Sequence, residues 1–208
     1  MPRLITFGDS FTYGHGLPDC HIPPGLAGPE CSKLSWPQLL GDKLGMEVIN
    51  RAKPGHSNIE ILRDLLRSTD ILPTDIVIIG WTYTVRDYVF KKNFLGKDVS
   101  FKVSPWIGEK SFIKKWFSVH NDYDLSVRAG LHIHHAECFL KTKEVNQYHF
   151  CAYREFFNTM PNFTRFPEHF ISQNILPKID KALDKSHPGP KSHEKAAENL
   201  YEIINAPE

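Results

Sequence analysis

The sequence predicts an α/β fold: a three-layer α/β/α sandwich on a doubly wound parallel sheet of the flavodoxin-like kind. Three short runs that read as strands, at residues 4–7, 47–52 and 75–80, support this prediction because each ends in a glycine or runs into one. Helical patterns separate the runs, and strands that alternate with helices pair in parallel through right-handed crossovers. Ligands bind such sheets where the carboxyl ends of the strands meet.

The first run, Leu4 to Phe7, leads into Gly8-Asp9-Ser10 and then into a loop rich in glycine and proline at residues 14–34. This pattern indicates a buried strand whose carboxyl end places a serine on a turn. A serine hydroxyl is a weak nucleophile that needs a base, itself oriented by a third group. The site therefore depends on residues elsewhere in the chain.

The next helix is expected to begin after Ser35 and to end at Gly45. Ser35 is the predicted N-cap, and Gln38, three residues later, would complete a capping box. Glycine is the residue most suited to the left-handed conformation that ends a helix.

The second run, residues 47–52, is followed by Gly55 and by a second capping box of Ser57 and Glu60, which opens a helix toward Arg67. Gly55 thus falls between the end of a strand and the start of a helix. Backbone N–H groups are free at such a position, and the helix dipole favours negative charge there.

The third run, Asp75 to Gly80, contains four consecutive β-branched residues and is expected to be buried on both faces. Regular patterning then stops between Tyr83 and Tyr123, where lysines and aromatic residues alternate irregularly. We interpret residues 83–123 as an insertion that forms a lid or substrate wall. A peripheral subdomain with its own small core is the alternative.

The rest of the chain is expected to hold a helix at 124–144, a fourth strand at 148–153, a helix at 175–183 and a terminal helix around 196–204. His132 and His135 form an i, i+3 pair on the first of these helices and would suit a metal, although a solvated or packed helix face is favoured.

Near the C-terminus, Asp184 precedes His187 by three residues, on a loop held by Pro188. This spacing would place a carboxylate beside an imidazole, which is the arrangement that fixes the tautomer of a catalytic base. His193, which follows, is interpreted as structural.

These motifs, taken in order, resemble the blocks of the SGNH (GDSL-type) hydrolase family. The blocks are Gly8-Asp9-Ser10, then Gly55, then Gly80-Trp81-Thr82, then Asp184 to His187. The resemblance spans nearly the whole chain. One block departs from the family pattern, because Thr82 stands where the family has asparagine.

The resemblance implies that Ser10 is the nucleophile, that His187 is the base and that Asp184 orients His187. It also implies an oxyanion hole formed by the backbone N–H groups of Ser10 and Gly55 and by a third donor. Thr82 would take the place of the missing asparagine, directly or through a water molecule. Asn58 is another candidate donor, and a hole with two donors is a further possibility. This chemistry requires no metal and no organic cofactor.

The function that the resemblance implies is hydrolysis of carboxylic esters, with short-acyl or acetyl esters, on a carbohydrate for example, as the expected substrates. An acyltransferase that uses an acceptor other than water is one alternative. A non-catalytic binding or structural protein built on the same fold is another. The expected partner is a small-molecule or glycan ester.

Length and charge agree with one globular domain over residues 1–208. The net charge of +1 gives no electrostatic footprint for nucleic acid, and no apolar run is long enough to span a membrane. The first predicted strand begins at about residue 3, so we expect no signal peptide and a cytoplasmic location. The four cysteines are expected to be free thiols, with a disulfide or zinc site at Cys20, His21 and Cys31 as the alternative.

Overall fold

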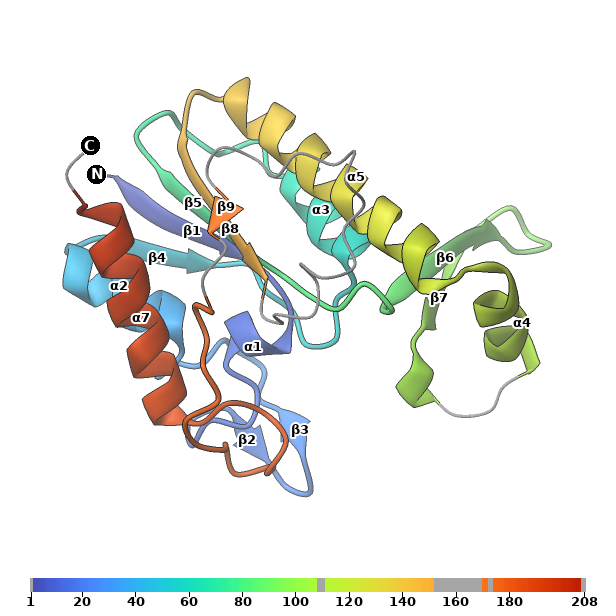
Figure 1. Ribbon diagram of the computed structural model, residues 1–208, viewed down its shortest axis with the longest axis horizontal. Coiled ribbons are helices and arrows are strands. Elements are labelled where there is room, and N and C mark those ends of the chain that lie inside the picture. Colours follow the sequence, from blue (N-terminus) through green and yellow to red (C-terminus); the bar gives the residue numbers. More distant parts are fainter. Residues whose placement is uncertain (1, 108–110, 152–169, 172–173, 207–208) are drawn as a thin grey trace.

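A computed structural model describes residues 2–107, 111–151, 170–171 and 174–206. Its centre is a five-stranded parallel sheet with the order β4-β1-β5-β8-β9 (Figure 1). The strands of this sheet are β1 (Arg3–Phe7), β4 (Glu47–Asn50), β5 (Ile76–Trp81), β8 (Asn146–Cys151) and β9 (Phe170–Ile171). In chain order this is the 2-1-3-4-5 arrangement of flavodoxin-like sheets. The predicted fold class and the first three predicted strands are confirmed.

Helices cover both faces of the sheet. They are α1 (Ser10–Tyr13), α2 (Trp36–Leu44), α3 (Asn58–Leu66), α5 (Asp122–Lys141) and α7 (Pro190–Ile204). Figure 1 shows α2 and α7 on one face and α3 and α5 on the other. Two buried clusters fill the layers between them, because neighbouring residues of a strand point to opposite faces. Ile5 therefore packs with α3 and α5, whereas Leu4 packs with α2 and α7.

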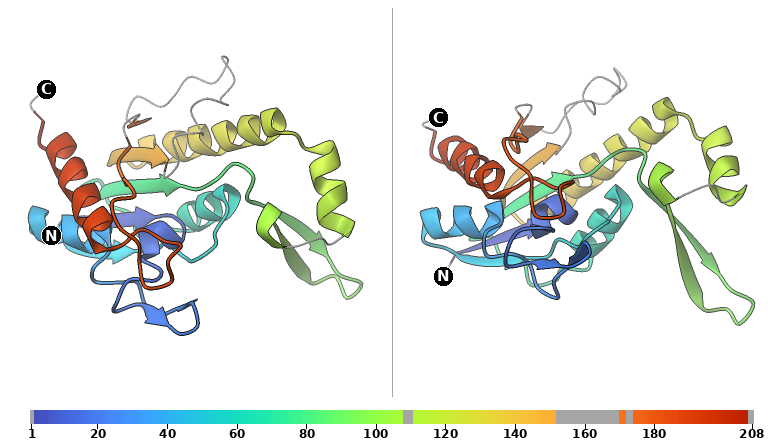
Figure 2. Two further views of the ribbon diagram at one scale, coloured as in Figure 1. Left: turned by 60° about the horizontal axis from the view of Figure 1, so that its bottom comes forward. Right: turned by 90° about the horizontal axis from the view of Figure 1, so that it is seen from below.

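The segment after β5 leaves the sandwich. It contains the antiparallel hairpin of β6 (Asp87–Lys92) and β7 (Asp98–Val103), a 3₁₀ turn η1 (Pro105–Ile107) and α4 (Ser111–Val119). Figure 2 shows this segment extending away from the layers before α5 returns the chain to the sheet. The guanidinium of Arg63 in α3 lies 5.6 Å from the ring of Phe90, so β6 also touches the sandwich. The role of residues 83–123 as a lid or substrate wall stays a prediction.

Several local predictions are confirmed. Ser57 and Glu60 form the second capping box, in which the Glu60 carboxylate accepts the Ser57 N–H at 3.0 Å. Gly45 ends α2 in the left-handed conformation with φ of +65°. The helix predicted at 124–144 is α5.

Two predictions about helices are wrong. Gln38 does not complete a capping box with Ser35, because its amide donates to Asp42 at 2.8 Å while the Ser35 hydroxyl donates to the carbonyl of Ser32. The helix predicted at 175–183 is absent from the described residues 174–183. Its backbone is used differently, since Ile179 N–H donates to the Ser192 hydroxyl at 3.0 Å.

The fourth predicted strand corresponds to β8, and its residues 152–153 lie outside the described residues. A small hairpin of β2 (His21–Ile22) and β3 (Leu26–Ala27), which the sequence analysis did not anticipate, sits in the long loop after α1. All four cysteines are free thiols. Within the described residues, no helix has both the length and the apolar character needed to cross a bilayer.

Candidate active site

Ser10 lies at the carboxyl end of β1, as the first residue of α1. The preceding Asp9 caps this short helix and accepts the N–H of Phe11 at 2.9 Å, and Gly14 ends it with φ of +83°. Gly8 is required because a Cβ atom there would collide with the hydroxyl of Thr12. Ser10 keeps only 4% of its surface exposed, so it is almost fully buried.

The loop before α7 carries the other two predicted residues. It is closed by a bridge between Lys181 and Pro188 and by a hydrogen bond of 2.9 Å from the N–H of Ala182 to the carbonyl of His187. The carboxylate of Asp180 accepts the N–H groups of Lys191 at 3.2 Å and Ser192 at 3.0 Å, which anchors the loop to the first turn of α7. The loop is therefore a fixed support for Asp184 and His187.

The two ends of the chain meet at Gly16. Its carbonyl accepts the N–H of Leu183 at 2.9 Å. A Cβ atom on Gly16 would lie 2.8 Å from Cγ of Asp184, and φ there is +85°. Glycine is thus needed both for the backbone conformation and for the close approach of the carboxylate.

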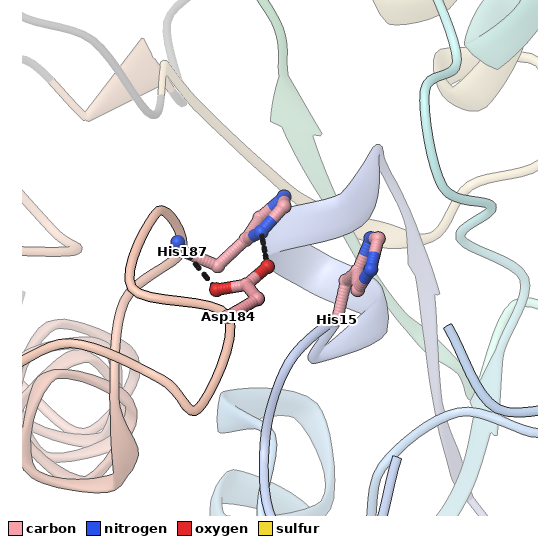
Figure 3. A group of neighbouring side chains, drawn as sticks. All are labelled: His15, Asp184 and His187. Carbon is pink, nitrogen blue, oxygen red and sulfur yellow. Dashed lines mark hydrogen bonds and ion pairs between the residues drawn. The ribbon is translucent and has the colours of Figure 1, made fainter. Parts of the chain in front are cut away.

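Ser10, His187 and Asp184 form a hydrogen-bonded chain. The Ser10 Oγ atom lies 3.0 Å from Nε2 of His187, and Nδ1 of His187 is hydrogen bonded to Oδ2 of Asp184. Figure 3 shows the two oxygens of Asp184 turned toward the ring and the backbone N–H of His187. The second oxygen accepts N–H groups of His187 at 3.1 Å and Ser186 at 3.0 Å.

The electrostatics of Asp184 suit the orientation of a histidine. Burial alone would raise the pKa of its carboxyl group, but the N–H groups of His187 and Ser186 and the imidazole of His187 lower that pKa well below its usual range. Asp184 is therefore a carboxylate throughout the neutral range, and it favours the His187 tautomer that carries its proton on Nδ1. That tautomer leaves Nε2 free to accept the Ser10 proton.

The backbone N–H groups of Ser10 and Gly55 have no acceptor among the described residues. Gly55 has φ of +76° and lies in the loop before α3. The side chain of Arg86 holds this loop against the serine turn, because its Nη1 donates to the carbonyl of His56 at 3.3 Å and to Asp9 at 2.9 Å. Free N–H groups in such a corner can receive a developing negative charge.

Solved structures share this architecture over nearly the whole chain. Est24, a carbohydrate acetylesterase from Sinorhizobium meliloti, has a TM-score of 0.58 at 12% identity, and the match covers 99% of each chain. The native aryl esterase of M. smegmatis has a TM-score of 0.56 at 11% identity, again over 99% of each chain.

The acetyl xylan esterase Est2A from the rumen bacterium Butyrivibrio proteoclasticus has a TM-score of 0.56 at 14% identity. That match covers 98% of this chain and 63% of Est2A. No protein-family model and no curated protein matches the sequence.

The chain has the SGNH hydrolase fold. The third block of this SGNH fold is where the chain departs from the pattern. Thr82 directs its hydroxyl to Oδ2 of Asp9 at 2.6 Å, and the same hydroxyl accepts from Arg86 at 3.1 Å. Asn58 pairs with the backbone of Thr82 on both sides, donating to its carbonyl at 3.2 Å and accepting its N–H at 2.9 Å. Thr82 and Asn58 thus form a buried support beneath Asp9 and Ser10.

Three residues at the site were missed by the sequence analysis. His15 stacks on His187 with ring centroids 4.4 Å apart and an interplanar angle of 24°. Arg86 and Lys102 belong to the insertion, and both reach back toward the first and second blocks of the SGNH fold. No spacing rule links them to Ser10, because they come from a segment without regular patterning.

His15, Asp184 and His187 are also the one group among the described residues whose ligand atoms lie close enough for a metal, all within 4.8 Å of one another. Within this group Nδ1 of His187 is hydrogen bonded to Asp184, and His15 Nε2 lies 3.1 Å from the carbonyl of Gly25. His132, at the i, i+3 position to His135, is not in such a group, and neither are Cys20 and Cys31.

Proposed function

We propose that this protein hydrolyses carboxylic esters, with Ser10 as nucleophile, His187 as general base and acid, and Asp184 as the group that orients His187. The observation that carries the proposal is the continuous hydrogen-bonded chain from the Ser10 hydroxyl through His187 to Asp184. A serine within 3.0 Å of a histidine that is oriented by a carboxylate is an activated nucleophile.

In the first half-reaction, the Ser10 Oγ–H proton passes to Nε2 of His187 while Oγ bonds to the ester carbonyl carbon. The carbonyl π electron pair moves onto oxygen and gives a tetrahedral oxyanion. When that pair re-forms the double bond, the bond to the leaving alkoxide breaks, and the alkoxide takes the proton from His187. An acyl-enzyme and an alcohol result.

The second half-reaction repeats these steps with water. His187 takes one proton from water as the hydroxide oxygen bonds to the acyl carbon. Collapse of the second oxyanion breaks the bond to Ser10, and Oγ takes the proton back from His187. The carboxylic acid is released and the starting state is restored.

The N–H groups of Ser10 and Gly55 are assigned as two donors to the oxyanion, because both lack acceptors among the residues that the structure describes. The Thr82 hydroxyl has one hydrogen, and that hydrogen is directed at Asp9. We therefore assign Thr82 to the support of Asp9 in the resting enzyme rather than to direct donation.

The proposed substrates are short-acyl esters, acetyl esters on carbohydrates first among them. Ser10 is almost fully buried, which favours a small acyl group. Est24 and Est2A, which share the fold, are a carbohydrate acetylesterase and an acetyl xylan esterase. Their names support the proposal for the acetyl group. The alcohol part of the substrate would be identified by measuring hydrolysis of a panel of acetylated sugars.

The proposal is tested with p-nitrophenyl acetate, butyrate and octanoate on the wild-type chain and on Ser10→Ala. We expect saturable hydrolysis of the acetate ester by the wild type, weaker hydrolysis as the acyl chain lengthens, and a background rate for Ser10→Ala. Equal rates for the two proteins on all three esters would contradict it. Ester consumption that releases acid only slowly, and is accelerated by added alcohols, would favour the acyltransferase alternative.

A further inference from the structure

The proposed oxyanion hole has a missing donor. The Thr82 hydroxyl and the Asn58 amide are the polar side chains that the sequence offers for it, and both are engaged within the protein. Losing one donor from an oxyanion hole typically costs about 10²- to 10³-fold in turnover. We therefore looked for another hydrogen-bond donor close to the N–H groups of Ser10 and Gly55.

Lys102 lies at this place, beside Gly55. It lies in β7, opposite Tyr88 in the register of the hairpin, and its side chain reaches back to Gly55. A Cβ atom on Gly55 would collide with the Lys102 Nζ atom and would lie 3.4 Å from its Cε. The ammonium group therefore rests directly on the residue whose N–H is the second proposed donor.

Among the described residues, no carboxylate pairs with the charge of Lys102 and no group accepts a hydrogen bond from its Nζ. The side chain is half-buried. An anion that approaches a partly buried ammonium group is attracted more strongly than it would be in bulk water. The ester oxyanion would be such an anion, and it forms only during the reaction.

Arg86, the neighbouring cation, already has hydrogen-bond partners within the protein. Its guanidinium pairs with Asp9 at 2.9 Å and lies 5.6 Å from the ring centroids of Tyr83 and Trp106. Because Arg86 joins Asp9 to the carbonyl of His56, it sets the distance between the serine turn and the Gly55 loop. Among the described residues, Lys102 is thus a cation beside Gly55 that is left for a ligand.

We propose that Lys102 is a catalytic residue that donates the third hydrogen bond to the oxyanion, in the place that SGNH enzymes give to asparagine. This inference rests on the proposed ester hydrolysis. Lys102 keeps its proton throughout: it donates a hydrogen bond as the carbonyl π pair moves onto oxygen, and that bond weakens when the double bond re-forms.

The electrostatic surroundings of Lys102 agree with this role. Burial lowers the pKa of its ammonium group and the Arg86 cation lowers it further, while Glu60 and Asp9 act in the opposite direction. The net pKa lies below the ordinary value of about 10.5. A desolvated ammonium of this kind gains more from a nearby anion than a solvated one does.

The test compares Lys102→Met with Lys92→Met, an exposed lysine on the same hairpin. We expect Lys102→Met to lower kcat for p-nitrophenyl acetate by about 10²- to 10³-fold with little change in KM, because the contact exists only in the transition state. Lys92→Met should leave both constants unchanged. A kcat for Lys102→Met within about twofold of the wild type would overturn the proposal.

The pH profile separates catalysis from a structural role. The wild type should lose kcat at alkaline pH as Lys102 gives up its proton, and Lys102→Arg should move that loss to higher pH because guanidinium stays charged. Lys102→Met should lack the alkaline loss. An identical alkaline limb in all three proteins would contradict the assignment.

Mono-p-nitrophenyl succinate, whose acyl group carries a carboxylate, tests the competing use of Lys102. If Lys102→Met raised KM for the succinate ester alone and left hydrolysis of the acetate ester intact, Lys102 would bind an anionic part of the substrate and the proposal would be overturned. A similar loss of kcat for both esters is the expected result.

A binding experiment does not depend on ester hydrolysis. Methylphosphonate, a tetrahedral oxyanion, is titrated into the full chain and into both lysine variants by calorimetry. We expect about tenfold weaker binding to Lys102→Met and no change for Lys92→Met. Equal binding to wild type and Lys102→Met would overturn the role of Lys102, whereas lysine-dependent binding without ester hydrolysis would contradict the proposed function and leave the anion site standing.

Discussion

The hydroxyl of Thr82 donates a hydrogen bond of 2.6 Å to Asp9, the residue that caps the helix carrying Ser10. A block that supplies an oxyanion donor in the SGNH pattern here holds the turn that carries Ser10 in place. Asp9 is almost fully buried and takes three hydrogen bonds, from Phe11 N–H, the Thr82 hydroxyl and Arg86. The threonine at position 82 and Arg86 of the insertion thus bind the same carboxylate, and they are hydrogen bonded to each other.

Replacing Thr82 with valine tests this support. Thr82→Val keeps the shape of the side chain but removes a donor from a buried carboxylate, which should lower the free energy of unfolding by about 1–3 kcal/mol. Thr82→Ser keeps the hydroxyl and should lose less. Urea denaturation of both variants measures the difference, and a Thr82→Val protein as stable as the wild type would speak against the Asp9 contact.

Replacing Gly16 with alanine tests the contact between the two ends of the chain. The new Cβ would lie 2.8 Å from Cγ of Asp184, so we expect kcat to fall at least about tenfold as the carboxylate is displaced. The left-handed backbone should cost about 1–2 kcal/mol of stability as well.

Gly45→Ala is the matched control for Gly16→Ala, because Gly45 has φ of +65° and no heavy atom within 4 Å of its Cβ position. It should lose similar stability and keep its activity. If both variants lost kcat equally, the close approach of Asp184 to Gly16 would not matter for catalysis.

Replacing His15 tests whether stacking holds the His187 ring. Aromatic pairs contribute about 0.5–1.5 kcal/mol beyond burial, so His15→Ala should lower kcat about two- to tenfold, with KM unchanged. His15→Phe keeps a ring against His187 and should recover most of the loss. Steady-state kinetics on an acetate ester decide the matter, and equal kcat in all three proteins would exclude a positioning role.

Acid should destabilise the protein through His193. Burial lowers the pKa of this histidine to about 4, and its Nδ1 accepts the N–H of Trp36 at 3.1 Å. The unfolded chain binds a proton near pH 6.5 and the folded chain does not, so stability falls as the pH drops from 6.5 to 4, by up to about 3 kcal/mol.

Urea unfolding of wild type and His193→Gln at pH 7 and pH 4.5 checks this prediction. Glutamine does not titrate, so the variant should be less stable at pH 7 but should lose less stability between the two pH values. The same loss in both proteins would show that other groups cause the acid sensitivity.

The parts of the fold that follow from local patterns could be predicted from the sequence. The apolar residues before Gly8 and Gly80 indicate β1 and β5, the short segment before Pro54-Gly55 indicates β4, and the Ser57–Glu60 capping box is a local signal. The segment 174–183 could not be predicted because its backbone bonds to the distant Ser192 side chain instead of to itself. Tertiary contacts of that kind leave no local pattern.

The candidate site divides in the same way. Ser10, Asp184 and His187 stand in recognisable motifs, whereas Arg86 and Lys102 come from an irregular segment, Arg86 just before β6 and Lys102 in β7. The role of Thr82 could not be predicted for a related reason. The sequence shows that the residue has a hydroxyl, but that hydroxyl is hydrogen bonded to Asp9, 73 residues away in the chain. Residues that act through contacts between distant parts of the chain can be identified only from a three-dimensional structure.

The most direct test of the central claim is the covalent labelling of Ser10. The intact chain is treated with a fluorophosphonate probe and the modified peptide is identified by mass spectrometry, with His187→Ala as the comparison. We expect one phosphonyl group on Ser10 in the wild type and labelling at least about 10²-fold slower in His187→Ala, because the base is lost. A wild-type Ser10 that stays unmodified, or that reacts equally fast without His187, would contradict an activated serine at this site.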